Sequence, residues 1–226
     1  MDTCKEPTLP LILIPENGQL DAAQWVQANR EKFEEDLANY GAILFRGFDI
    51  RKAEDFSRFM KCFNTEPLPY MFRSSPREEL NKSIKNIYLS TSYPNDRSIN
   101  MHNESSYSRV WGKKIIFCCI TPAAQGGETP IADSRKVLQS INPELVDKFK
   151  AKGVKYRRNL IANIGMPWQE VFQTDDKAVV ESTCRKNGID YNFHHRGRRR
   201  SCPNHLIITL QVSITRYEYY TFHQSA

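Results

Sequence analysis

The chain has 226 residues, of which 40% are hydrophobic, 26% charged and 11% aromatic, so it carries enough apolar side chains for a folded core. This composition excludes a disordered chain, and the longest apolar run, residues 9–15, is far shorter than the ~20 residues of a membrane-spanning helix. We therefore expect one globular domain over residues 1–226, located in the cytoplasm.

The net positive charge of the chain is concentrated in one short stretch of the sequence. There are 32 Lys and Arg against 26 Asp and Glu, a net charge of +6, and the arginines of the 196–200 run supply four of these charges. Aromatic side chains are not interleaved with this run, as stacking on single-stranded nucleic acid would require. Nucleic-acid binding is therefore the weakest of the functions that we considered.

Six cysteines follow no repeating spacing, and no CxxC pair is present. Zinc ribbons and thioredoxin-like redox sites both need such a pair. We interpret the cysteines as reduced thiols of a cytoplasmic protein.

Helical and extended patterns alternate in the first part of the chain. An apolar run predicts a strand at 9–14, and Asp21 is suited to cap a helix that continues to about residue 39 and ends at Gly41. The next expected segments are a buried strand at 42–45, a helix at 53–63, a proline-containing loop at 64–84 and a strand at 85–90.

Strand patterns dominate the rest of the chain. The apolar run Ile115 to Ile120 predicts a central strand at 114–121, and a Gly-Gly turn leads to another strand at 128–132. One helix should begin at Ser134, a second should run from the cap Asn142 to Gly153, and 168–187 is mainly helical. Further strands are expected at 154–158, 189–193, 206–212 and 216–222.

No strand–helix–strand alternation with a glycine-rich phosphate loop is present, which argues against a nucleotide-binding fold. We expect a mainly β fold with peripheral helices, a double-stranded β-helix of the jelly-roll type.

His102 and Glu104 are the strongest candidates for a metal site. Residues i and i+2 of an extended segment project to the same side, so both side chains can reach one ion. Imidazole together with carboxylate suits Fe(II), Mn or Zn. The pair alone is also common in polar loops, so its interpretation depends on the surrounding sequence.

The surrounding sequence carries four recognisable segments: GAILFRGF at 41–48, SYPxDxSIxxHNExSYS at 92–108, TPAxQGGETPIADSRKVL at 121–138 and PWQEVFQT at 167–174. Together they resemble the taurine dioxygenase (TauD/TfdA-like) family of Fe(II)/2-oxoglutarate oxygenases, in its SyrP-like branch from nonribosomal-peptide clusters. The resemblance covers about residues 9 to 195, and the combination is specific although each segment alone is not.

The resemblance implies that His102 and Glu104 are two of three iron ligands and that Thr129 contacts 2-oxoglutarate. It also implies oxidative decarboxylation of 2-oxoglutarate to succinate, coupled to hydroxylation of an unactivated C–H of a small amino-acid-like substrate, free or tethered to a carrier protein. Relatives that chlorinate have a small residue in place of the carboxylate, so Glu104 favours hydroxylation.

The third iron ligand has two interpretations. His205 is followed eleven residues later by Arg216, a spacing that fits the distal histidine and the arginine that pairs with 2-oxoglutarate. Alternatively, residues 206–222 resemble the segment that precedes the distal histidine, in which case the chain is a C-terminally truncated family member. The sequence therefore predicts either an oxygenase or a catalytically inactive remnant that acts as a binding protein.

Overall fold

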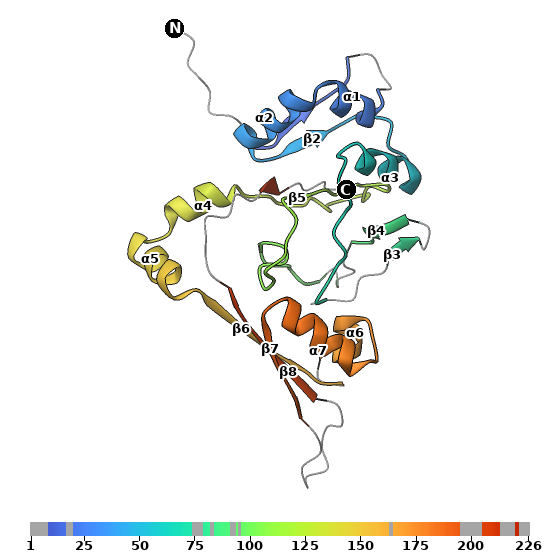
Figure 1. Ribbon diagram of the computed structural model, residues 1–226. Coiled ribbons are helices and arrows are strands. Elements are labelled where there is room, and N and C mark those ends of the chain that lie inside the picture. Colours follow the sequence, from blue (N-terminus) through green and yellow to red (C-terminus); the bar gives the residue numbers. More distant parts are fainter. Residues whose placement is uncertain are drawn as a thin grey trace.

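The computed structural model describes residues 9–16, 20–73, 79–81, 84–90, 94, 96–162, 165–194, 205–212 and 220–221. Its elements follow in the order β1, α1, α2, β2, α3, β3, β4, β5, α4, α5, β6, α6, α7, β7, β8, β9 (Figure 1). Within these residues the strands form four small sheets of two or three strands.

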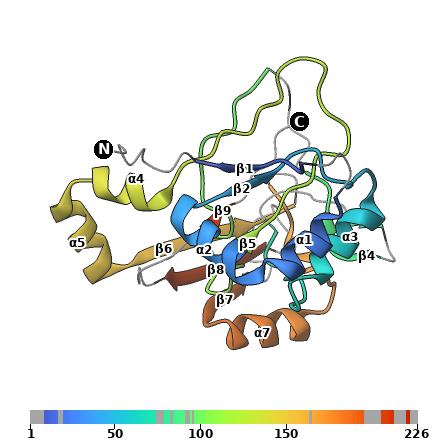
Figure 2. The ribbon, with the colours of Figure 1, turned by 90° about the horizontal axis from the view of Figure 1, so that it is seen from above.

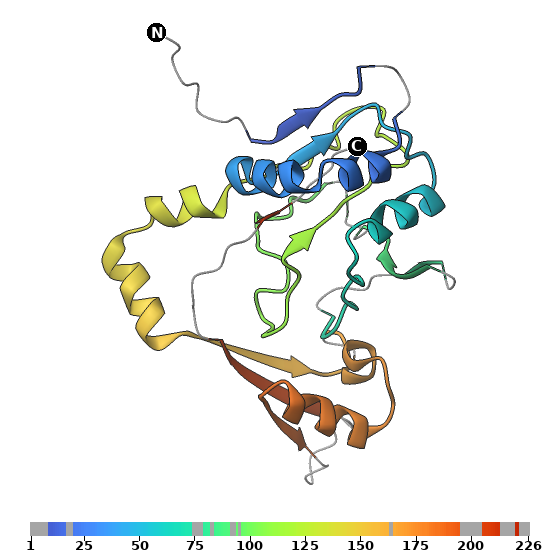
Figure 3. The ribbon, with the colours of Figure 1, turned by 45° about the horizontal axis from the view of Figure 1, so that its top comes forward.

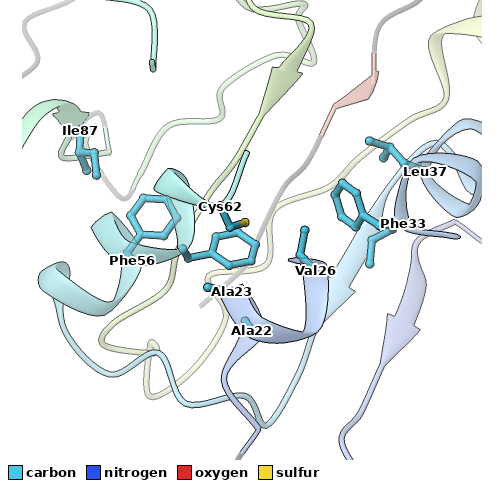
Figure 4. Close-up of a cluster of buried hydrophobic side chains, with 10 residues drawn as sticks. Ala22, Ala23, Val26, Phe33, Leu37, Phe56, Cys62 and Ile87 are labelled. Carbon is cyan, nitrogen blue, oxygen red and sulfur yellow. The ribbon is translucent and has the colours of Figure 1, made fainter. Parts of the chain in front are cut away.

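The N-terminal elements pack around one apolar cluster. β1 (Leu11–Leu13) and β2 (Ile43–Phe45) pair in parallel and lie side by side in Figure 2. Helices α1 (Ala22–Ala28), α2 (Arg30–Tyr40) and α3 (Ala53–Lys61) pack beside this pair. Their buried side chains meet with Ile87 of β4 (Ile84–Tyr88), as the close-up in Figure 4 shows. Apolar faces at helical spacing therefore build this part of the core.

A second core lies on one face of an antiparallel sheet. β6 (Val154–Leu160) and β7 (Ile189–His194) both pair with the central strand β8 (His205–Val212). Alternate residues of β8, Leu206, Ile208 and Leu210, are buried. They pack with side chains of α6 (Trp168–Phe172) and α7 (Lys177–Lys186), so these two helices cover one face of the sheet.

A long segment and two helices join the two cores. After β3 (Glu79–Asn81) and β4, the described residues between 89 and 133 contain one short strand, β5 (Lys114–Ile115), which pairs in parallel with β9 (Tyr220–Thr221). Helices α4 (Ser134–Ser140) and α5 (Pro143–Lys152) then lead along the edge of the molecule to β6, and neither helix has a buried residue (Figure 3).

Most helix predictions are confirmed. The Asp21 carboxylate accepts hydrogen bonds from the backbone N–H of Ala23 and Gln24, and Asn142 caps α5 by accepting from the N–H of Glu144. Gly41 ends α2 in the left-handed conformation, with φ +78°. The predicted helix at 21–39 is instead two helices, α1 and α2, which meet at Asn29.

Two strand predictions are wrong. The expected central strand at 114–121 is only two residues long, and residues 128–132 form no strand. Ile116 and Cys118 nevertheless pack against the N-terminal core. The residues of this run are therefore apolar because they pack in the core, and not because they belong to a long strand. The expected loop at 64–84 also contains the short strand β3. Of the predicted strand at 216–222, residues 216–219 and 222 lie outside the described residues.

The expectation of a mainly β fold is confirmed only in part. The described residues mix helices and strands, and their four small sheets do not close into a barrel. Among the described cysteines, Cys62, Cys118, Cys119 and Cys184 are free thiols. No helix in the described part of the chain is long and apolar enough to cross a membrane.

Candidate functional site

The predicted ligand pair lies on the loop that separates the two cores. Residues 98–103 form neither helix nor strand, and 104–107 form a turn in which Ser105 has φ +56°. Two residues anchor the end of this turn. Tyr107 packs against the second core, and the buried Ser108 donates its backbone N–H to the Ser105 carbonyl at 2.9 Å. The loop is thereby held at one end while its polar side chains reach solvent.

His102 and Glu104 point toward one another. The Nε2 atom of His102 lies 3.7 Å from Oε2 of Glu104, and the two side chains are 57% and 28% exposed. The expectation that i and i+2 side chains converge is met, although a turn and not a strand produces it. Two donors that bind one ion at about 2.0–2.2 Å each must lie within about 4 Å of one another. The observed separation satisfies that limit.

The backbone fixes which nitrogen of His102 is available. Nδ1 lies 2.8 Å from the Asn100 carbonyl oxygen, which can only accept a hydrogen bond. Nδ1 therefore carries the proton, and the lone pair of the neutral ring resides on Nε2, the atom that faces Glu104. Metal-bound histidines use this arrangement, in which the outer nitrogen donates to a carbonyl and the inner nitrogen binds the ion.

His102 and Glu104 are the two side chains of this candidate metal site. Within the described residues, no three His, Cys, Asp or Glu side chains lie close enough together to hold a metal ion. One imidazole and one carboxylate still match the chemistry of Fe(II), since the facial triad of non-haem iron sites consists of two imidazoles and one carboxylate. The residues present therefore fit such an ion as part of its ligand set.

Thr129 lies in the segment between β5 and α4, where its side chain is half-buried. The end of this segment contacts the ligand loop, since the Ser134 hydroxyl donates to Oδ1 of Asn103 at 3.3 Å. Arg135 fastens the same end to α2 by donating to the Ala38 carbonyl at 2.6 Å. The role of Thr129 toward 2-oxoglutarate stays a prediction.

The guanidinium of Arg135 also fixes the start of α4. It forms an ion pair with Asp133 at 2.8 Å, and this hydrogen-bonded contact lowers the pKa of the Asp133 carboxyl. Asp133 in turn caps α4 by accepting from the backbone N–H of Arg135. The segment that carries Thr129 thus ends at an ion pair whose two residues also contact the start of α4 and the end of α2.

The structure places His205 beside another histidine. It begins β8, where its ring stacks on His194, and it does not join His102 and Glu104 in a three-residue metal group. Arg216 lies outside the described residues. The structure thus brings His102 and Glu104 together but leaves the assignment of the third ligand and of the 2-oxoglutarate arginine as predictions.

Two supporting contacts were missed from the sequence. The Asn100 carbonyl orients His102, and Arg158 of β6 places its guanidinium carbon 5.5 Å from the centre of the Tyr107 ring. The first contact is made by the backbone, which leaves no residue-type signal. The second joins positions 51 residues apart, and only the inward-facing position of an arginine in a predicted strand hinted at it.

The chain also matches known proteins. Residues 8–214 match the model of the taurine catabolism dioxygenase TauD, TfdA family. The chain is 41% identical over 157 residues to the dapdiamide synthesis protein DdaC of Enterobacter agglomerans, which covers 70% of this chain and 47% of that protein. It is 30% identical over 183 residues to a clavaminate synthase-like protein of Arabidopsis thaliana, which covers 77% of this chain and 54% of that protein.

The match over residues 8–214 makes the chain a member of the TauD/TfdA dioxygenase family. Family members have a jelly-roll fold and generally use Fe(II) and 2-oxoglutarate. The chain spans about half the length of the curated relatives it matches.

Proposed function

We propose that this protein is an Fe(II)/2-oxoglutarate-dependent oxygenase in which His102 and Glu104 hold the iron. The observation that carries the proposal is the convergence of the His102 Nε2 lone pair and the Glu104 carboxylate, 3.7 Å apart, inside a segment whose sequence is typical of the family. Iron with its 2-oxo acid supplies the oxidising power for C–H hydroxylation when bound.

The chain's own residues perform the positioning. The Asn100 carbonyl holds the His102 proton on Nδ1 and directs Nε2 to the ion. Glu104 supplies an anionic oxygen, which favours a divalent cation over a neutral ligand. Thr129 is proposed to donate its hydroxyl to 2-oxoglutarate, and Arg216 to pair with the distal carboxylate of that acid.

The proposed substrate is a small amino-acid-like molecule, free or attached to a carrier protein. Support for this class comes from the resemblance to the nonribosomal-peptide branch. The alternative proposal is a protein that binds iron or a small ligand without catalysis.

Iron binding is tested by titrating the protein with Fe(II) under anaerobic conditions in the presence of 2-oxoglutarate and following the metal-to-ligand absorption band. We expect one ion per chain and a loss of affinity of at least about 10-fold in His102→Ala or Glu104→Gln, because losing a ligand costs no less than losing a hydrogen-bond partner of a ligand. His205→Gln is the informative comparison. A loss equal to that of His102→Ala would assign His205 as the third ligand.

Catalysis is tested separately by measuring succinate formation from 2-oxoglutarate in air. Candidate amino acids and carrier-bound aminoacyl groups are then compared for the mass gain of one oxygen atom. Fe(II) binding that needs His102, without succinate from any mixture, would support the non-catalytic alternative. An absence of Fe(II) binding by the folded protein would contradict the oxygenase proposal and leave only a binding protein for a small ligand.

A further inference from the structure

An apolar hollow of about 350 Å³ lies against the N-terminal core. Its walls come from α2, β2, α3 and the segment 116–122, so two distant parts of the chain enclose it. Among the described residues that line it, seven are phenylalanines and one, Arg46, is charged. Packed cores rarely leave voids much larger than a water molecule. A hollow of this size and lining is instead typical of a small-molecule site.

Aromatic contacts shape the walls of the hollow. The ring of Phe45 in β2 meets the rings of Phe48 and Phe59 edge-on, with centroids 5.1 Å and 5.7 Å apart. Phe33 of α2 and Phe56 of α3 are buried and also line the hollow, and Figure 4 shows both side chains. Rings that are fixed by such contacts cannot collapse into the space between them as flexible side chains could. The hollow is therefore largely preformed.

The open end of the hollow is positively charged. Of the residues that line it, Arg46, Gly47 and Pro122 are exposed, whereas Phe33 and Ile43 are buried. Arg46 directly follows β2, and its backbone N–H donates to a carbonyl of β1 at 2.9 Å, which fixes its main chain. Within the described residues, its guanidinium forms no ion pair or hydrogen bond. A cation without a partner at the mouth of an apolar hollow favours an anionic group.

The carboxylate near the opposite wall already has partners. Burial, Cys119 and Asp55 together raise the pKa of Cys118, which lines the hollow, to about 11. Asp55 accepts hydrogen bonds from two backbone N–H groups before α3, each at 3.2 Å, and forms an ion pair with Arg58 at 3.4 Å. An anionic ligand should therefore place its charge at Arg46 and its apolar part toward Cys118.

We propose that this hollow binds a medium-chain alkyl carboxylate, with the alkyl chain against the phenylalanines and the carboxylate on the Arg46 guanidinium. At about 30 Å³ for each group the size of a water molecule, the volume takes about ten to twelve such groups, so a chain of about ten carbons fits. A guanidinium binds a carboxylate through two parallel hydrogen bonds. Neither His102 nor Glu104 lines the hollow, so this site does not depend on the proposed function.

The test is a calorimetric titration of the full chain with decanoate, octanoate, 1-decanol and decyltrimethylammonium. Decanoate should bind as one molecule per chain. Octanoate should bind about tenfold more weakly, because two fewer methylene groups leave water. Decyltrimethylammonium has the same chain with the opposite charge, and it should bind more weakly than 1-decanol.

One substitution isolates the role of the charge. Arg46→Gln should weaken decanoate binding about fivefold and change 1-decanol binding by less than about twofold. Arg51→Gln is the matched control, since Arg51 is exposed, pairs with Asp49 and does not line the hollow. It should leave the affinity for decanoate within about twofold.

A measurement without substitutions covers the case of a variant that does not fold. Decanoate should slow iodoacetamide labelling of Cys118 and Cys119, which line the hollow, as read by peptide mass spectrometry. Cys184 lies in the second core and is the internal control. The slowing at Cys118 and Cys119 should exceed that at Cys184 by at least about threefold.

Three results would overturn the proposal. They are equal affinities for decanoate and octanoate, equal losses in Arg46→Gln and Arg51→Gln, and equal protection of the three cysteines. Sedimentation of the ligand-free protein tests another occupant. A dimer that shields Cys118 and Cys119 without decanoate would assign the hollow to a second copy of the chain and would likewise overturn the proposal.

Discussion

Arg158 holds the main chain at Phe72, because its Nη1 donates a hydrogen bond to the Phe72 carbonyl at 2.8 Å. Its Nη2 donates to the next carbonyl, that of Arg73, at 2.7 Å, and the guanidinium lies over the Tyr107 ring. Burial lowers the pKa of Arg158, but a guanidinium stays protonated in proteins. One half-buried cation thus joins the antiparallel sheet, residues 72–73 and the end of the ligand loop.

Replacing this cation should destabilise the protein. Arg158→Met leaves two carbonyls without their donor and removes the cation from Tyr107, so we expect the free energy of unfolding to fall by about 2–4 kcal/mol. Urea denaturation measures this change. The matched control is Arg157→Met, the exposed neighbour on the opposite face of β6, which should change stability by no more than about 0.5 kcal/mol. Equal effects of the two substitutions would contradict the role given to Arg158.

The stacked histidines predict a pH dependence of stability. The folded-state pKa of His205 is lowered, so the unfolded chain binds a proton more readily than the folded one. Its contribution to stability is therefore full above the ordinary histidine pKa, near 6.5, and is lost as the pH falls below that value. His194 opposes it directly, and Asp190, Arg157 and Lys155 share the sheet face further along the strands.

The measurement is the urea midpoint at pH 7.5 and at pH 5.5, with a chelator present to remove bound metal. The loss of stability on acidification should be smaller in His205→Gln than in the unsubstituted protein. An unchanged pH dependence in His205→Gln would contradict the lowered pKa.

Two thiols should react slowly in the folded protein. Burial raises the pKa of both Cys118 and Cys184 to about 11. At pH 8 only about one molecule in a thousand then carries the reactive thiolate at either position. We expect iodoacetamide to label these residues at least tenfold more slowly in the folded protein than in urea, as read by peptide mass spectrometry. Equal rates in the two conditions would show that these thiols are not protected.

The helices could be predicted from the sequence because their signals are local. Asp21 and Asn142 lie next to the backbone N–H groups that they cap, and Gly41 supplies the left-handed residue at the end of α2. The strand at 114–121 could not be predicted in the same way. Its apolar run reports burial, whereas strand length depends on a partner, and β5 finds its partner 106 residues later in β9.

The same difference between local and long-range contacts applies to the candidate site. The approach of His102 to Glu104 follows from their spacing of two residues, and the sequence predicted it. The contact of Arg158 with Phe72 spans 86 residues, and the contact of His205 with His194 depends on the register of a hairpin. Neither can be read from a local pattern, so the sequence offers His205 as an iron ligand only through its spacing to Arg216, with a truncated chain as the alternative.

The end of α2 allows a last prediction about the anchor of the Thr129 segment. Gly41 has φ +78°, which a residue with a Cβ adopts at a cost, and its backbone N–H donates to the Leu37 carbonyl at 2.9 Å. A Cβ here would also lie 3.3 Å from Nη2 of Arg135, the residue that ties α4 to the Ala38 carbonyl. Gly41→Ala should therefore lower the free energy of unfolding by about 1–2 kcal/mol.

Gly126→Ala is a control that separates the cost of a positive φ from the cost of the contact with Arg135. Gly126 has a similar φ of +71°, but a Cβ there would meet no atom within 4 Å. This substitution should cost only the conformational part, about 1 kcal/mol, because Gly126 lies in an exposed loop and ends no helix. Both variants are measured by urea denaturation. A Gly126→Ala loss as large as that of Gly41→Ala would mean that contact of the new Cβ with Arg135 adds nothing to the conformational cost.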